Sequence, residues 1–232
     1  MSVWKAILRG MYKVPGPTLN IKSGQNLRRF STELVAQNTR PVILSIGCGN
    51  RPLPDSSEFL RCSVVYVDIS VEPIVDVQAD AHVLPFGDDS FDGVVSLAML
   101  EHVRKSEWVV SEIHRVLRPG GLVYAEVPFM QGFHARPHDF RRFTVPGVRV
   151  LFDKFEEIDL GACVGPGSAV AWMLRQYLAG MVTGFGLGRK RRLVAEFVAG
   201  WMTFYFKYFD YLTLDKPAAW EIASAFYYYG HK

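Results

Sequence analysis

The sequence predicts an α/β fold built on a doubly wound, mostly parallel sheet, and three observations support this prediction. Short apolar runs, typical of strands buried on both faces, occur at 42–46, 64–68 and 122–128. Segments with helical spacing of apolar residues stand between such runs, so strand and helix alternate along the chain. The first run ends at Gly47 and Gly49, which indicates a tight turn that leaves backbone open to a ligand.

Composition and charge limit the classes of function. The chain has 232 residues, of which 49% are hydrophobic and 21% charged, so it can bury a full core. Its net charge of +3 is too small to indicate a nucleic-acid partner. The three cysteines are scattered without metal-ligand spacing, which favours a reducing compartment, and we expect no metal. Because we find no secretory leader and no simple membrane span, the expected location is the cytoplasm, including the inner face of the membrane.

The first 40 residues are expected to form N-terminal helices before the sheet begins. Residues 3–12 and 24–38 show helical spacing, and Pro15-Gly16-Pro17 separates them. The first of these segments interleaves apolar and cationic residues. It therefore fits a helix packed on the body of the protein or one lying on a membrane surface.

An acid at the end of the second strand gives the first functional prediction. Asp68 follows Gly49 by 19 residues and closes the apolar run 64–68. An acid in this position is well placed to hold ribose hydroxyls, whereas the plain alternative is a turn-forming residue after a strand. Pro52 argues against a dinucleotide motif, because it disrupts the third-glycine pattern that a pyrophosphate needs.

Five motifs in order then identify a resemblance. They are Ile-Gly-Cys-Gly at 46–49, Asp68, the stretch from Ala79 to Asp92 with Leu-Pro-Phe and Ser-Phe-Asp, Leu-Glu-His-Val at 100–103, and Leu-Arg-Pro-Gly-Gly at 117–121. With them, the chain from about 42 to 128 resembles a class I S-adenosylmethionine-dependent methyltransferase of the type 11 kind, with a Rossmann-like sheet and an antiparallel last strand. The resemblance implies that the glycines approach the methionine and ribose, Asp68 binds ribose, Asp80 and Ala81 meet adenine, and Ser96 and Leu97 line the methionine side. The implied cofactor-binding residues are Ile46, Gly47, Cys48, Gly49, Asp68, Ile69, Asp80, Ala81, Ser96 and Leu97.

Two positions depart from the family pattern. Ser45 stands where the family usually has an acid, and Arg51 stands where it usually has a third glycine. The first change removes a carboxylate that would help to hold the ammonium of the cofactor. The second adds a bulky cation near a sulfonium ligand.

A polar cluster after the fifth strand supplies the candidate catalytic residues. The segment 134–144 follows the carboxyl end of a central strand, where ligands bind in such sheets. His134 and His138 are candidates for the base that a hydroxyl acceptor needs, and Asp139 is the third catalytic candidate. The structural alternative is that Asp139 pairs with Arg142 and that Thr144 caps the next helix. The candidate substrate-binding residues are Glu101, His102, Arg136 and Arg142.

The C-terminal part carries an insertion. After a sixth strand at 155–160, two apolar segments at 168–187 and 193–214 flank Arg189-Lys190-Arg191-Arg192, and the best last strand lies at 222–230. We therefore expect N-terminal helices over 1–40, a methyltransferase domain over 41–166 and 218–232, and a helical hairpin over 167–217. Within 194–212, small and polar residues form one narrow stripe, and the wide remaining arc is rich in aromatic residues. A lid, a homodimer interface and a membrane-surface contact through 168–214 all fit this arc.

The predicted function is methyl transfer from S-adenosylmethionine. The favoured acceptor is a hydroxyl on a sugar or a lipid-linked glycan, because of the polar cluster and the aromatic hairpin. The alternatives are a soluble aromatic or other small molecule as acceptor and, in a different class, a non-catalytic module that binds the cofactor and regulates or scaffolds.

Overall fold

The structure is a computed structural model that describes residues 15–53, 59–134, 137–184 and 189–232, without the side chains of 182–184 and 189–193. The expected helix at 3–12 and the predicted substrate residue Arg136 lie outside the described residues. The side chains of the basic run Arg189–Arg192 lie outside them as well.

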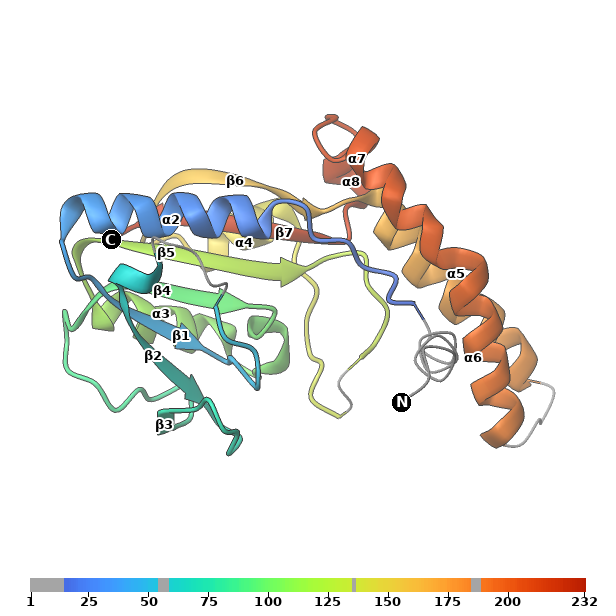
Figure 1. Cartoon of the computed structure of the whole chain (residues 1–232), viewed down its shortest axis with the longest axis horizontal. Coiled ribbons are helices and arrows are strands. Elements are labelled where there is room, and N and C mark those ends of the chain that lie inside the picture. The colour runs from blue at the N-terminus through green and yellow to red at the C-terminus, as the bar shows by residue number, and fades with distance from the viewer. Residues whose placement is uncertain (1–14, 54–58, 135–136, 185–188) are drawn as a thin grey trace, which may run out of the picture. The chain divides into compact units, whose positions relative to one another are not determined.

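Seven strands form one sheet with the order β3-β2-β1-β4-β5-β7-β6 (Figure 1). The strands are β1 (Val42–Ile46), β2 (Ser63–Asp68), β3 (Val77–Gln78), β4 (Phe91–Leu97), β5 (Leu117–Pro128), β6 (Glu156–Val164) and β7 (Ala225–His231). Strand β1 pairs in parallel with β2 and with β4, and β4 pairs in parallel with β5. Strand β7 runs antiparallel to β5. The carboxyl ends of β1, β2, β4 and β5 therefore meet at one edge of the sheet.

Helices and short turns connect these strands. The α-helices are α2 (Ser23–Gln37), α3 (Ser106–Val116), α4 (Val145–Leu151), α5 (Pro166–Gly184), α6 (Arg189–Thr203), α7 (Asp210–Thr213) and α8 (Ala219–Ile222). The 3-10 segments are η1 (Phe59–Arg61), η2 (Leu100–His102) and η3 (Phe204–Phe209). Thr144 is the N-cap of α4, as the structural alternative for segment 134–144 predicts, and its hydroxyl accepts the Gly147 N–H at 3.2 Å.

Both faces of the sheet are covered. Adjacent residues of a strand point to opposite faces, and in β7 Tyr229 meets Phe30 of α2 whereas Tyr228 stacks on Phe152, which follows α4. Gly93 in β4 lets α2 approach, because a Cβ there would lie 2.6 Å from Cδ1 of Leu34. Apolar strands are thus buried between helices, and the predicted doubly wound sheet with an antiparallel last strand is confirmed.

The chain divides into two compact units. The α/β unit contains residues 21–129, 133–163 and 225–232, and the helical unit contains 15–20, 130–132 and 164–224. Within the helical unit, α5 packs against α6 and η3, which is the predicted helical hairpin. Among the described residues, no helix combines the length and the apolar character that a membrane crossing requires.

The second arm of the hairpin differs from the expected continuous helix over 193–214. Helix α6 ends at Thr203, and the chain continues as the 3-10 segment η3 before α7 begins at Asp210. The tighter segment brings the buried carboxylate of Asp210 to the first turn of α5, where Oδ1 accepts the Gly167 N–H at 2.6 Å and Oδ2 accepts the Ser168 hydroxyl at 2.6 Å. Backbone N–H groups at a helix start lack helical partners, so a carboxylate from another element satisfies them.

Candidate functional site

The turn after β1 presents open backbone on one side and packs tightly on the other. Gly47 and Gly49 have φ values of 70° and 52°, in the left-handed region that favours glycine. A Cβ at Gly47 would lie 2.1 Å from Cγ of Met99, so a side chain is excluded there. A Cβ at Gly49 would meet nothing within 4 Å. The turn is therefore fixed against Met99 at its first glycine and leaves room for a ligand at its second.

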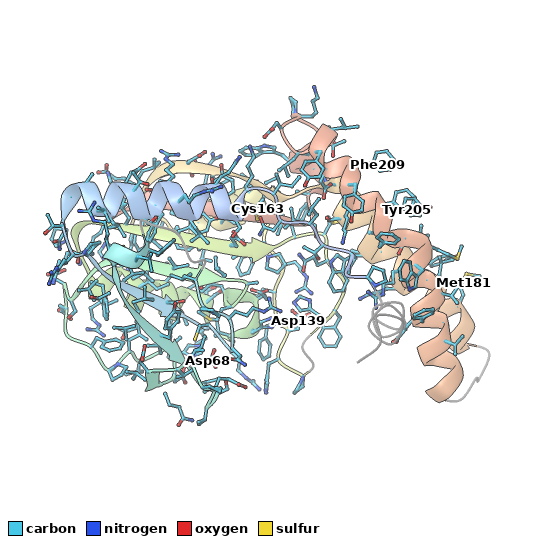
Figure 2. All side chains as sticks on the ribbon, in the orientation of Figure 1. Asp68, Asp139, Cys163, Met181, Tyr205 and Phe209 are labelled. Carbon is cyan, nitrogen blue, oxygen red and sulfur yellow. The ribbon has the colours of Figure 1, made fainter. Side chains whose placement is uncertain are left out.

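Asp68 ties the end of β2 to this turn. Its Oδ2 accepts the Gly49 N–H at 2.8 Å, and its Oδ1 accepts the backbone N–H and the hydroxyl of Ser70 at 2.8 and 2.6 Å. Burial alone would raise the pKa of Asp68, but the hydrogen bonds from Ser70 and Gly49 lower it below its usual value. The carboxylate is therefore ionised at neutral pH and lies at the edge where the parallel strands end (Figure 2).

The residues expected around adenine lie beyond β2 and β3. The Ile69 side chain is 70% exposed although it is large and apolar. Asp80 follows β3, and its Oδ1 accepts the backbone N–H of His82 at 2.9 Å and contacts the ring Nδ1 of His82 at 2.6 Å. Ala81 stands between these two residues and is half-buried. The Gln78 side chain donates to the Ile69 carbonyl at 3.0 Å, which joins the ends of β2 and β3.

The end of β4 turns sharply toward the next cluster. Ser96 is fully buried, and its hydroxyl has no hydrogen-bond partner among the described residues. Leu97 is the last residue of the strand, and Ala98 follows with a φ of 50°, which is unusual for a residue with a side chain. The Ala98 N–H donates to the Glu126 carbonyl of the neighbouring strand at 2.9 Å. This turn directs η2, which contains Glu101 and His102, to the same sheet edge as the glycine turn.

Glu101, His102 and His134 form what we call the Glu–His–His cluster. One carboxylate oxygen, Oε1 of Glu101, lies 3.6 Å from Nε2 of His102 and 3.9 Å from Nε2 of His134. Glu101 is fully buried, and neither carboxylate oxygen has a hydrogen bond from another of the described residues. Burial raises the pKa of Glu101 to about 7. The two imidazoles are about one quarter exposed, so ligands can reach them.

His102 is held in one tautomer. Its Nδ1 donates to the backbone carbonyl of His138 at 2.6 Å, which leaves Nε2 with a lone pair when the ring is neutral. Burial lowers the pKa of His102 below its ordinary value, so the neutral ring dominates at neutral pH. The rings of His102 and His134 meet edge to face with centroids 5.2 Å apart.

An ion pair holds the loop that carries His134. Arg142 donates to both carboxylate oxygens of Asp139, at 2.6 and 2.7 Å, as the structural alternative for this segment predicts. The same carboxylate accepts the backbone N–H of His134 at 2.8 Å. Burial alone would raise the pKa of Asp139, but these hydrogen bonds outweigh it and lower the pKa to about 2. Asp139, labelled in Figure 2, is therefore an ionised anchor for the loop.

The predicted residues of this segment separate in space. His134 enters the cluster, whereas the side chain of His138 is exposed and lies beside Phe140, with ring centroids 6.1 Å apart. His138 contributes its carbonyl to the cluster instead. The Phe140 N–H donates to the Glu101 carbonyl at 2.8 Å, which joins the loop after β5 to η2.

Sequence reasoning missed three parts of this arrangement. It did not anticipate the support that Ser70 gives to Asp68, the Met99 contact behind Gly47 or the left-handed Ala98. The Asp-x-Ser spacing after β2 could have indicated Ser70, because an Asp side chain often accepts the N–H two residues on. Nothing in the sequence distinguishes Ala98 from an ordinary helix former.

Ser45 and Arg51, the two departures from the expected pattern, differ in how exposed they are. Ser45 is buried in β1, with 5% of its surface exposed. Arg51 is exposed, and its backbone N–H donates to the Cys48 carbonyl at 3.0 Å. Burial raises the pKa of the Cys48 thiol to about 11, so the thiol is neutral and is no nucleophile at neutral pH.

Comparisons with known proteins agree with this geometry. The family model described as "Methyltransferase domain" matches residues 44–125. The demethylmenaquinone methyltransferase of Renibacterium salmoninarum is 30% identical over 126 residues, which cover 50% of this chain and 53% of that protein. The 24-methylenesterol C-methyltransferase 2 of Arabidopsis thaliana is 28% identical over 127 residues, which cover 46% and 35%. The matches span about half or less of these curated relatives.

Solved structures show the same fold. The 1,6-didemethyltoxoflavin-N1-methyltransferase of Burkholderia thailandensis, solved with S-adenosylhomocysteine, has a TM-score of 0.50 and 17% identity, covering 89% of this chain and 77% of that one. The [4+2]-cyclase SpnF has a TM-score of 0.50 and 17% identity, covering 90% and 81%. With the sheet order and the glycine turn, these findings show that residues 44–125 form a methyltransferase domain with the Rossmann-like fold of S-adenosylmethionine-dependent methyltransferases.

Proposed function

We propose that the chain transfers a methyl group from S-adenosylmethionine to a hydroxyl on a sugar or a lipid-linked glycan. The observation that carries this proposal is the Glu–His–His cluster, which lies at the same sheet edge as the Gly47–Gly49 turn. A sugar hydroxyl is a weak acid, so its methylation needs a nearby proton acceptor. Fold alone does not carry the argument, because the similar SpnF structure is described as a cyclase.

The residues present fit the cofactor. Space beside Gly49, where a Cβ would meet nothing within 4 Å, suits a ligand that lies on bare backbone. The ionised Asp68 would accept from the ribose hydroxyls, and a ribose hydroxyl would replace the bond that the Ser70 side chain now makes to it. The remaining assignments follow the expected pattern: Ile46, Gly47 and Cys48 in the turn, Ile69, Asp80 and Ala81 around adenine, Ser96 and Leu97 at the methionine end.

The chain contributes alignment and proton transfer. When bound, the cofactor supplies a methyl group attached to a positively charged sulfur, which any correctly placed nucleophile can accept. Nε2 of His102 has the lone pair needed to take the hydroxyl proton, and His134 lies within the same cluster. Asp139 and Arg142 act through His134, because they fix its loop. Much of the rate enhancement would come from holding the acceptor in line.

Exposed rings and a cation beside the cluster favour a sugar. Phe133 and Phe140 are 51% and 40% exposed, and the Arg104 guanidinium lies 5.4 Å from the centroid of the Phe140 ring. A sugar has an apolar face that can lie on such rings and hydroxyls that accept from a guanidinium. A second candidate acceptor is an aromatic small molecule, because one relative is described as a demethylmenaquinone methyltransferase. The non-catalytic module is the alternative from another class.

We expect Asp68→Ala and Gly49→Val each to weaken S-adenosylmethionine binding at least tenfold. The first loses hydrogen bonds from a charged acceptor, worth about 1.5–3 kcal/mol, and the second fills the space beside the turn. Isothermal titration calorimetry measures both, with circular dichroism to confirm folding. Asp153→Ala, which removes an exposed acid after α4, is the matched control and should bind normally. Unchanged affinity in a folded Asp68→Ala would remove the ribose assignment.

The histidines give a kinetic prediction. Transfer of tritiated methyl is measured into soluble glycosides and lipid-linked oligosaccharides, with catechol as a phenolic probe. On the glycan acceptor, His134→Ala should lower kcat roughly 10²-fold with little change in cofactor affinity, because the cluster loses one of its two imidazoles. His138→Ala should lower kcat by less than about threefold, because its ring is exposed and its carbonyl remains.

Three results would contradict this assignment. Equal turnover in His134→Ala and His138→Ala would show that the cluster has a structural role and takes no part in catalysis. Methylation of catechol alone would favour the aromatic acceptor. Cofactor binding without transfer to any probe would favour the non-catalytic module.

The helical unit offers a second surface, which we call the aromatic arc. The buried residues of α6, η3 and α7 are small or polar, namely Ala199, Gly200, Thr203 and Asp210. Nine large apolar residues on the same elements are 40–69% exposed, namely Val194, Val198, Trp201, Met202, Tyr205, Tyr208, Phe209, Tyr211 and Leu212. Phe197, Phe204 and Phe206 are half-buried. Figure 2 shows Tyr205 and Phe209 pointing outward. Helix α5 therefore covers the small and polar stripe and leaves the arc uncovered.

We propose that an anionic lipid surface covers the aromatic arc. The run Arg189–Arg192 begins α6, immediately before the arc, and the sequence has no carboxylate between Tyr177 and Glu196. Aromatic residues next to a run of cations are typical of helices that lie at a membrane interface. Each cation near an anionic surface contributes about 1 kcal/mol, and salt screens this attraction.

Liposome flotation tests the arc. The wild type should float with anionic vesicles at low salt, and changing Arg189, Lys190, Arg191 and Arg192 to serine should release it, as should high salt. Trp201→Ser should weaken flotation, whereas Trp108→Ser, which removes an exposed tryptophan of α3, should not. A wild type that stays at the bottom of the gradient as a stable dimer would show that a second copy covers the arc.

A further inference from the structure

The Glu–His–His cluster has the donors of a metal site. Two imidazole nitrogens and one carboxylate oxygen all lie within 4.8 Å of one another. Two histidines and one carboxylate, with positions left for water or substrate, form the ligand set of catalytic zinc sites and of several iron enzymes. Metal-ligand spacing in the sequence does not reveal this set, because Glu101 and His102 lie on η2 and His134 lies in the loop after β5.

The distances fit an ion of the size of Zn²⁺. Two donors each about 2.1 Å from a tetrahedral ion lie about 3.4 Å apart. Oε1 of Glu101 is 3.6 and 3.9 Å from the two Nε2 atoms, so both distances are within a few tenths of an ångström of this value. To bring the two nitrogens together from at most 4.8 Å, each ring would need to move by less than about 1 Å.

The charge of the cluster also favours a cation. The Glu101 carboxylate is fully buried, and neither oxygen receives a hydrogen bond from another described residue. Arg142 lies in the loop that carries His134, and both of its terminal nitrogens donate to Asp139. An ionised carboxylate without such donors is costly to bury, and a bound cation removes that cost.

The surroundings hold the ligands as metal sites usually do. A histidine that ligates a metal commonly donates its other ring N–H to a carbonyl or a carboxylate. His102 already donates from Nδ1 to the His138 carbonyl at 2.6 Å, which directs the Nε2 lone pair into the cluster. Nδ1 of His134 lies 3.3 Å from Nη2 of Arg142, a group that can only donate, and 3.7 Å from Oδ2 of Asp139. In the loaded site the ring would turn so that Nδ1 donates its proton to this Asp139 oxygen and Nε2 ligates the ion.

We infer that Glu101, His102 and His134 bind one divalent transition-metal ion, of the class of Zn²⁺ or Co²⁺. The binding of the ion rests on the cluster alone, and its catalytic meaning rests on the proposed function. A hydroxyl that binds a divalent ion has a lower pKa, as a water bound to zinc does. In the loaded site the ion would occupy the Nε2 lone pair of His102, which in the metal-free cluster is free to accept the proton. An acceptor hydroxyl bound to the ion would then release its proton to solvent and react as the alkoxide.

Cobalt binding by the full chain, without a histidine tag and freed of metal by a chelator, tests this inference. Co²⁺ titration followed by visible absorption should show one ion per chain, and Zn²⁺ should displace it. Glu101→Gln and His134→Ala should each weaken Co²⁺ binding at least 10²-fold, because each removes a direct ligand. His138→Ala, which removes an exposed imidazole from the same loop and keeps the carbonyl, is the matched control and should bind normally.

The outcomes separate this inference from the proposed function. No stoichiometric Co²⁺ binding, or binding that both ligand variants retain, would overturn the metal site even if methyl transfer proceeds. Binding lost in folded Glu101→Gln and His134→Ala, but kept in His138→Ala, would establish the site even if no glycan is methylated. Circular dichroism of each variant shows that a loss of binding is not a loss of fold.

Discussion

The hydrogen bond from the Gly49 N–H to the Asp68 carboxylate, 2.8 Å long, is the contact on which the site depends. It joins the turn after β1 to the end of β2, so two strands that are neighbours in the sheet present one surface to a ligand. The bond needs the left-handed backbone of Gly49 and an ionised acid at that strand end. Ser70 holds the other oxygen of the same carboxylate. One acid thus builds the turn, and under the proposed function it also binds the cofactor.

A second constraint operates on the neighbouring strands. Glu101 carries a buried carboxylate at the end of β4, and the Asp139–Arg142 pair fixes the loop after β5 that brings His134 to it. Burying polar groups is costly unless they are used. These polar groups are the ones to which the proposals assign the acceptor and the ion, and the His102 N–H joins them to the Met99 carbonyl at 2.8 Å.

The sequence predicted the fold well, because the fold depends on local patterns, and the binding of the cofactor at the Gly47–Gly49 turn stays a prediction. Apolar runs marked the buried strands. The turn glycines Gly47 and Gly49 directly follow the first of these strands, and Asp68 is the last residue of the second. The cluster was only half predicted: His134 and Glu101 were candidates, but their proximity depends on the left-handed Ala98 and on how η2 meets the loop after β5. The 3-10 segment η3 was missed, because the carboxylate of Asp210 determines its path by reaching the start of α5. Long-range contacts of this kind leave no periodic signal.

A crystal structure with S-adenosylhomocysteine bound tests the central claim most directly, namely that the edge formed by the Gly47–Gly49 turn and Asp68 holds the cofactor. The account predicts both ribose hydroxyls within about 3 Å of the Asp68 carboxylate oxygens, the adenine beside Ile69, and the ligand lying on the backbone of Gly49. A ligand bound elsewhere, or a ribose turned away from an Asp68 that keeps its bonds to Ser70, would contradict it.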